Sequence, residues 1–336
     1  MKNVCTRRLT LAAGLGGVAG RLLAPSPSRA GQRRRVVRLG VVTPLNSSLG
    51  QACTGFAEAA AANPELADTI QFEVHANGEL GGEIEVVQAC IAGIVDLVFA
   101  TSNVVAALVP ELGLLDASFL FRDANHARAT LDGPIGAEFA DILRAKDMHL
   151  LAWGENGLRH VTANRPVRGT GDLADLHIRV PQSAVMVEGF RALGAAPETL
   201  PFPQLYEALR TGRFEAQENP VATTLSAHFN EVQRCLSLTG HVYSAAFFLA
   251  SRDLLDELSD AQRAALISCS RIGAQASRDA AARGERDGIA QLRAAGMKIV
   301  EDVDRTALAA KCRPALDAAA WRLGADRAAR IKAVAT

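Results

Sequence analysis

The stretch from Asp175 to Pro220 decides the fold; it reads D-L-H-I-R-V-P-Q-S at 175–183 and F-R-A-L-G-A-A-P-E-T-L-P-F-P-Q-L-Y-E-A-L-R-T-G-R-F-E-A-Q-E-N-P at 190–220. Residues 176–180 predict a short strand that ends at Pro181, because proline cannot donate to a sheet ladder. Helices are predicted at 188–193 and 205–209, each followed closely by a glycine that can end it. Residues 217–220 are predicted to be extended or in a turn, since Pro220 disfavours helical backbone at Asn219.

The rest of the chain repeats this alternation of strands and helices. A strand at 149–153 is predicted to end in a turn at 155–157, and residues 110–121 are predicted to form a loop. The pattern indicates a layered α/β fold with a mostly parallel sheet. The other predicted strands are 36–43, 70–76, 95–100, 242–250 and 297–300, and the other predicted helices are 50–62, 83–92, 124–131, 136–146, 253–295 and the remainder to 335.

Binding sites in such sheets lie beyond the carboxyl ends of the strands. That rule points to residues 43–48 and 101–103, and so to Ser48 and Asn103 as candidate ligand-binding side chains. Glu83 and Glu85 form a carboxylate pair on a predicted helix, where we interpret them as a solvated, exposed face.

The composition is that of a globular chain of 336 residues, 49% hydrophobic and 21% charged, long enough for two domains. The first thirty residues contain five of the 36 basic residues and none of the 36 acidic ones, which leaves the remainder at a net charge of −5. This balance argues against nucleic-acid binding, despite the run Arg33-Arg34-Arg35.

Residues 1–30 have the features of an export signal. The segment Thr6-Arg7-Arg8-Leu9 resembles the twin-arginine type, an apolar segment follows at 11–23, and Ser28-Arg29-Ala30 offers a cleavage site. The apolar segment is too short and too rich in glycine to span a bilayer. We predict export with cleavage near Ala30; the alternative is an amphipathic helix or an uncleaved anchor.

Five cysteines follow the predicted cleavage site, and no C-x-x-C pair suggests metal or redox chemistry. We expect buried free thiols, with a single disulfide left open as the alternative. No motif for a metal or a cofactor was found. The five are Cys53, Cys90, Cys235, Cys269 and Cys312.

A series of motifs, in order along residues 36–320, resembles one known family. They are E-L-G-G-E at 79–83, F-L-F-R-D at 119–123, W-G-E-N-G-L-R-H at 153–160, I-R-V at 178–180, R-A-L-G-A-x-P at 191–197, Y-E-A-L-x-T-G at 206–212, Q-E-N-P at 217–220, E-V at 231–232 and S-L-T-G-H-V-Y-S at 237–244. The family is that of the dicarboxylate-type periplasmic solute-binding subunits of TRAP (tripartite ATP-independent periplasmic) transporters.

The resemblance implies a two-lobed, class II periplasmic-binding fold in which each lobe is a mixed, mostly parallel sheet flanked by helices. Lobe 1 would comprise residues 31–156 and 245–284, and lobe 2 residues 157–244 and 285–336. A long helix near 253–295 would run across both lobes. The chain would be a periplasmic monomer.

The resemblance also assigns site residues. Arg179 matches the family's ligand arginine, and a planar guanidinium suits a carboxylate because it can donate two parallel hydrogen bonds. Arg159 matches a second supporting arginine, and Asn219 an asparagine that contacts or positions the carboxylate. Phe202 and His241 would line the cleft. The alternatives are a surface or inter-strand ion pair for each arginine, a turn-stabilising asparagine, and a core role for Phe202 and His241.

This chain departs from the family pattern at two places, and these departures leave the identity of the substrate undetermined. Many relatives carry a histidine in the first strand-to-helix loop, where this chain has residues 46–50 without one, and residues 101–103 contain no acid. The implied function is capture of a small organic acid (a dicarboxylate, keto or hydroxy acid, or sugar acid) and delivery to a membrane permease. The alternatives are a ligand sensor that signals to a receptor, and an exported enzyme, for which no catalytic motif was found.

Overall fold

The structure is a computed structural model that describes residues 34–335. The predicted export signal and its cleavage site near Ala30 lie outside the described residues. All elements below belong to the unit that spans residues 34–336.

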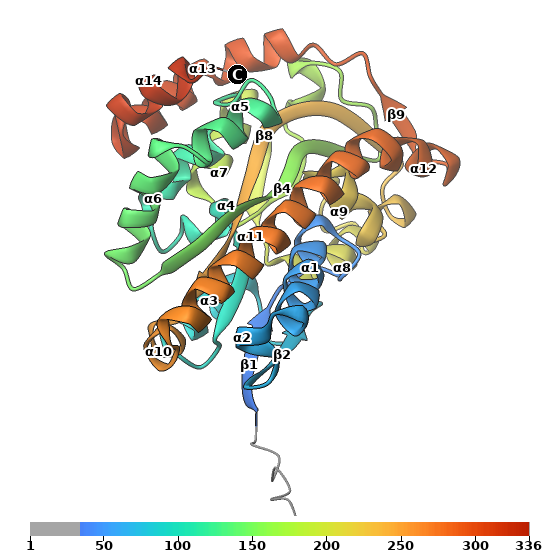
Figure 1. Cartoon of the computed structure of the whole chain (residues 1–336). Coiled ribbons are helices and arrows are strands. Elements are labelled where there is room, and N and C mark those ends of the chain that lie inside the picture. The colour runs from blue at the N-terminus through green and yellow to red at the C-terminus, as the bar shows by residue number, and fades with distance from the viewer. Residues whose placement is uncertain (1–33, 336) are drawn as a thin grey trace, which may run out of the picture. The chain divides into compact units, whose positions relative to one another are not determined.

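One mixed sheet organises the described residues, with strand order β2-β1-β3-β8-β4-β7-β5-β6 and with β9 paired to β8 (Figure 1). Its outer parts are parallel, because β1 pairs in parallel with β2 and β3, and β5 with β6 and β7. Its centre is antiparallel, where β8 pairs with β3 and β4, and β4 with β7. The strands are β1 (Arg35–Gly40), β2 (Ile70–His75), β3 (Leu97–Thr101), β4 (His149–Ala163), β5 (His177–Val180), β6 (Ala196–Thr199), β7 (Ala216–Pro220), β8 (Cys235–Ala250) and β9 (Lys298–Val300).

The two central strands are much longer than predicted. β4 has 15 residues and β8 has 16, and they pair along nearly their whole length. The predicted turn at 155–157 is wrong, because the register shifts there, between Glu155 and Gly157, while the strand continues. A bulge inserts an extra residue without ending the ladder, and Gly157 supplies the positive φ of 126° that this one uses. The chain therefore crosses from one end of the sheet to the other within β4 and β8, which are paired with each other.

The predicted helix at 253–295 is interrupted. Its break lies at Leu258, whose backbone is extended, so α10 (Arg252–Glu257) is separate from α11 (Asp260–Arg283). A single π-helical segment at Gly284–Gly288 then joins α11 to α12 (Ile289–Ala294). Figure 1 shows α11 in orange lying alongside α1 and across β4, and both contacts are close.

The predicted helix over the remainder to 335 is two helices, because Gly324, with a φ of 136°, separates Arg305–Leu323 from Ala325–Ala333. The other predicted helices are confirmed within a few residues, and the predicted loop at 110–121 contains a 3₁₀ helix at Pro110–Asp116. The remaining helices are α1 (Ser48–Ala62), α2 (Pro64–Ala67), α3 (Glu83–Ile91), α4 (Ser102–Val105), α5 (Ala124–Leu131), α6 (Pro134–Arg144), α7 (Ala184–Leu193), α8 (Leu205–Arg210), α9 (Val221–Ser226), α13 (Arg305–Leu323) and α14 (Ala325–Ala333).

Apolar clusters cover both ends of the sheet, and α13 joins two of them. Leu308 and Cys312 pack in the cluster that contains β5 and α7. Farther along the same helix, Leu316 and Ala319 pack in the cluster that contains α5 and α6. The five cysteines named above are buried and unbridged, as predicted, so they contribute as small apolar side chains.

The N-terminus of α11 is held by a capping box at Ser259. The Gln262 amide donates to Ser259 Oγ at 3.2 Å, and the Ser259 amide donates to Gln262 Oε1 at 3.1 Å. Ser259→Ala should destabilise the protein by about 1 kcal/mol, because it leaves a helix N–H without its partner. Thermal melting should show Ser259→Asp, which keeps an acceptor, close to the wild type; equal losses in both variants would contradict the role of the cap.

Candidate functional site

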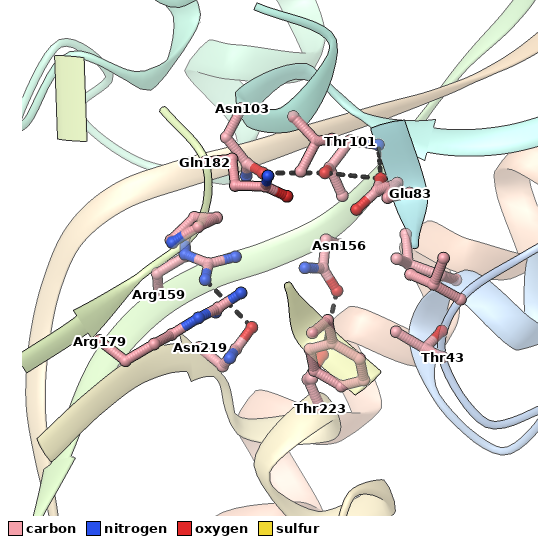
Figure 2. Close-up of a pocket in the computed structure, with 15 residues that line it drawn as sticks. Thr43, Glu83, Thr101, Asn103, Asn156, Arg159, Arg179, Gln182, Asn219 and Thr223 are labelled. Atoms are coloured by element: carbon pink, nitrogen blue, oxygen red, sulfur yellow. Dashed lines mark hydrogen bonds between the residues drawn. The ribbon is translucent and has the colours of Figure 1, made fainter. Parts of the chain in front are cut away.

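A cavity opens where several strands end, as the strand-end rule predicted for residues 43–48 and 101–103. Figure 2 shows Arg159, Arg179 and Asn219 on one side of it, Glu83 and Thr43 on the other, and Asn156 between. β4, β5 and β7 supply the first group, and the start of α3 and the segment after β1 supply the second. Further lining residues are Val42, Leu49, Thr101, Asn103, Val104, Pro181, Gln182, Phe202 and Thr223.

Arg179 is a buried cation without a carboxylate partner among the described residues. Its side chain comes from β5, the residue is only 3% exposed, and its Nε and Nη2 donate to the carbonyl oxygen of Leu200. None of the ion pairs formed by residues 34–335 includes it. Burial lowers the pKa of Arg179, while the more distant charge of Glu218 acts in the opposite direction. The guanidinium therefore faces the cavity with its charge uncompensated at contact range.

Arg159 is the opposite case, because Glu218 neutralises it directly. Its Nε donates to Glu218 Oε2 at 2.5 Å and its Nη2 to Glu218 Oε1 at 2.7 Å, a two-point ion pair in which both side chains are buried. Nη2 also donates to Asn219 Oδ1 at 3.0 Å. This contact is the inter-strand ion pair that the sequence analysis gave as the alternative role of Arg159. Arg159 also lines the cavity.

His241 supports this pair from behind the cavity wall. Its Nε2 lies 3.1 Å from Glu218 Oε2, and its Nδ1 lies 2.8 Å from Thr239 Oγ1. Burial lowers the pKa of His241, which favours the neutral ring with Nε2–H donating to the carboxylate. Burial by itself would raise the pKa of Glu218, but the charge of Arg159 and the hydrogen bond from His241 lower it overall.

Asn219 lies on the same side of the cavity as Arg159 and Arg179 (Figure 2), and two hydrogen bonds orient its amide. Its Oδ1 accepts from Arg159, and its Nδ2 donates to Gln217 Oε1 at 2.7 Å. One amide hydrogen remains for a ligand after that bond.

The opposite wall carries Glu83, which corrects the sequence interpretation. We expected a solvated carboxylate on an exposed helix face, but the residue is only 9% exposed and lines the cavity. Its Oε1 accepts from the Thr101 amide at 2.5 Å and from Thr101 Oγ1 at 2.8 Å. Burial raises the pKa of Glu83, and the bonds from Thr101 and the charges of both cavity arginines act against that rise. Asn103 continues this wall, donating to Ser244 Oγ at 3.2 Å.

Asn156 connects the two walls at the bulge of β4. Its Oδ1 accepts from Thr223 Oγ1 on α9 at 3.1 Å. Ser48 Oγ on α1 donates to the backbone carbonyl oxygen of Asn156 at 2.8 Å and also lies 3.1 Å from Oδ1. Because Oδ1 is occupied, its Nδ2 is the group available to a ligand. Ser48 is thus adjacent to the site through Asn156 and is not itself part of the lining.

The predicted site residues therefore separate into two groups. Arg179, Arg159, Asn219, Phe202 and Asn103 line the cavity, whereas Ser48 and His241 lie one layer behind it. Sequence reasoning missed Glu218, which lies inside the Q-E-N-P motif, and Glu83, which lies inside E-L-G-G-E. Residues 34–335 contain no group of His, Cys, Asp and Glu side chains placed to hold a metal ion.

The cavity is narrow, with a volume of about 30 Å³. That is room for roughly two water molecules. An organic acid of four or more carbons can enter only when the walls move apart.

Comparison with known proteins identifies the family. Residues 39–322 match the profile of bacterial extracellular solute-binding protein, family 7 (DctP). The chain belongs to this family. It is a solute-binding protein and not an enzyme, so the alternative of an exported enzyme is set aside.

Individual relatives agree with that assignment. A solute-binding protein of Verminephrobacter eiseniae is 37% identical over 279 residues, 83% of each chain. The 2,3-diketo-L-gulonate-binding periplasmic protein of Escherichia coli is 35% identical over 239 residues, 71% of this chain and 73% of its own. The crystal structure of a TRAP periplasmic solute-binding protein from Polaromonas sp. JS666, bound to D-erythronate, superposes with a TM-score of 0.87 at 34% identity and covers 90% of this chain and 100% of that one.

The two-lobed α/β fold is confirmed by these neighbours. The lobe boundaries after residues 156, 244 and 284 stay a prediction. None of the helices in residues 34–335 combines the length and apolar character needed to cross a bilayer.

Asp116 is a buried carboxyl group whose protonation should make stability depend on pH. It is fully buried, Ser102 Oγ donates to its Oδ1 at 2.7 Å, and its Oδ2 has no partner among the described residues. Burial raises its pKa from 3.8 to about 8, and the charges of Glu218 and Glu83 add to the rise. The folded state therefore keeps a proton that the unfolded chain releases.

Stability should accordingly fall as pH rises through the interval between these two pKa values, about 4 to 8, and stop falling above it. Asp116→Asn removes this titration, so its melting temperature relative to wild type should climb across that interval and then level off. Asp141→Asn, at an exposed carboxylate, is the control and should track the wild type. Parallel wild-type and Asp116→Asn profiles would contradict the assignment.

Proposed function

We propose that this protein captures a small organic acid outside the cytoplasm and delivers it to the membrane permease of a TRAP-type transporter. The observation that carries the proposal is Arg179, a buried guanidinium that faces the cavity with no carboxylate in contact among the described residues. An isolated charge is costly to bury, and the cost is recovered when an opposite charge pairs with it. A ligand carboxylate is the matching partner, because it can accept two parallel bonds from the guanidinium fork.

The neighbours of Arg179 complete an anion subsite. Asn219 has an amide hydrogen to offer the same carboxylate, and the bond from Arg159 fixes the orientation of that amide. Arg159 acts mainly as a positioning residue, since Glu218 balances its charge. Phe202 supplies an apolar wall. His241 and Ser48 act through Glu218 and Asn156, respectively.

The ligands of relatives support an organic acid. D-erythronate is bound in the Polaromonas protein, and the Escherichia coli relative is named for 2,3-diketo-L-gulonate. Both are acids that carry several oxygen substituents, which suits a cavity lined with amides and hydroxyls on the side away from Arg179.

Entry and release require the walls to separate, because the cavity holds only about two water molecules as it stands. We propose that the lobes hinge where β4, β8 and α11 pass between them, and that the ligand favours the closed form through contacts with both walls. The permease would then recognise the closed form, and the protein would act as a periplasmic monomer after cleavage of an export signal near Ala30.

A second candidate is a sensor that presents the same closed form to a receptor. Genes for permease subunits beside this one would favour transport, and a gene for a sensor kinase would favour signalling. The ligand chemistry at Arg179 is the same in both cases.

A thermal-shift screen of mono-, di-, keto- and sugar acids tests the anion subsite. A ligand at a hundredfold excess over its dissociation constant should stabilise the wild type by roughly 2.7 kcal/mol. Arg179→Met should abolish this shift without lowering the melting temperature of the unliganded protein, because it removes a buried unpaired charge and keeps most of the volume. Arg179→Lys should bind weakly, since it keeps the charge but loses the fork.

The control is Arg191→Ala, at an exposed arginine on α7, which should bind as the wild type does. Undiminished binding by Arg179→Met would show that the anion subsite has been placed on the wrong residue.

A further inference from the structure

Among residues 34–335, the cavity lining offers a ligand one cation that no carboxylate contacts, Arg179. Two guanidiniums line it, but Arg159 is held by both oxygens of Glu218 at 2.5 and 2.7 Å. Breaking that buried pair to bind a second ligand carboxylate would leave Glu218 buried and unpaired, which is strongly unfavourable. Arg159 can still offer hydrogens of Nη1, whose partner is Ser244 Oγ at 3.5 Å, but its charge is already balanced by Glu218. Of the two arginines, Arg179 is therefore the one with charge left to pair with an acid group.

The wall opposite Arg179 carries an acidic side chain. Glu83 stands across the cavity from Arg179 (Figure 2). Thr101 holds its Oε1 with two hydrogen bonds, which fixes the carboxyl group in the wall. Its Oε2 makes no hydrogen bond within residues 34–335, so that oxygen is available as an acceptor.

The groups between these two ends suit hydroxyls. Asn156 Oδ1 accepts from the Thr223 hydroxyl and lies 3.1 Å from the Ser48 hydroxyl, which leaves the Nδ2 of Asn156 to donate to a ligand oxygen. Thr43 lines the same wall. A ligand hydroxyl can donate to Glu83 and accept from Asn156, whereas a second carboxylate can only accept and would face the like charge of ionised Glu83.

We infer that this site selects a hydroxylated monocarboxylate, such as an aldonic acid, and that Glu83 is the residue that excludes dicarboxylates. This inference rests on the proposed function, since it takes Arg179 as the anchor. It narrows the ligand class, which the fold and the arginine leave open between one acid group and two.

Matched acids test the inference by isothermal titration at pH 8. Each pair has the same number of carbons and differs at one end: D-erythronate against meso-tartrate, and D-gluconate against D-glucarate. The wild type should bind at least one aldonate about a hundredfold or more tighter than its diacid partner, because a like-charge contact costs several kcal/mol and 1.4 kcal/mol is tenfold. Butyrate, which has the carboxylate but no hydroxyl, should bind far more weakly than D-erythronate.

Glu83→Gln is the decisive variant, since it keeps the shape and the acceptor for Thr101 while removing the charge. Its preference for the aldonate over the diacid should fall by about tenfold or more, mainly through tighter diacid binding. Glu85→Gln removes the same charge from an exposed position on the same helix and should leave the preference unchanged. Melting temperatures of both variants check that the fold is intact.

Three results would overturn the inference: a wild type that prefers the diacids, a wild type that binds neither aldonate, or a Glu83→Gln variant with unaltered preference. The proposed function has a separate test. If succinate or another diacid binds and Arg179→Met abolishes that binding, the anchor stands and only the role of Glu83 is wrong.

Discussion

The site depends on an imbalance of buried charge at Arg179. Arg159 is paired with Glu218, whereas the Nε and Nη2 of Arg179 donate to a backbone carbonyl oxygen. Arg179 has no acidic partner in contact within residues 34–335. A chain selected for stability alone would pair this cation or replace it, because removing a buried charge often stabilises a protein. Its retention is explained by a ligand that supplies the missing carboxylate, and the remaining features serve to place that cation and limit what can pair with it.

The Arg159, Glu218 and His241 network provides the rigid support. Each polar atom of the Glu218 carboxylate has a partner, and a fully satisfied network fixes side-chain positions more firmly than separate contacts do. It also holds Asn219 beside Arg179. The long strands β4 and β8 bring these residues together from distant parts of the sequence. The subsite is therefore ordered when the protein folds, and ligand binding does not have to supply the free energy of ordering its side chains.

Local patterns predicted most of the helices and strands, and the motif around Ile178-Arg179-Val180 predicted the central cation. They failed where burial depends on distant partners. Residues 155–157 predict a turn, but β8 continues the ladder past Gly157. Glu83 was placed on an exposed helix face because nothing local shows that Thr101 would bond to it. The pairing of Arg159 with Glu218 likewise spans strands that only the sheet topology brings together.

The most direct test of the central claim is a crystal structure of the protein with the tightest-binding organic acid found by screening. The complex should show closed lobes and a ligand carboxylate with both oxygens about 3 Å from nitrogens of Arg179, a distance typical of charge-assisted hydrogen bonds. A bound acid whose carboxylate lies elsewhere, with Arg179 still bonded only to the Leu200 carbonyl, would contradict it.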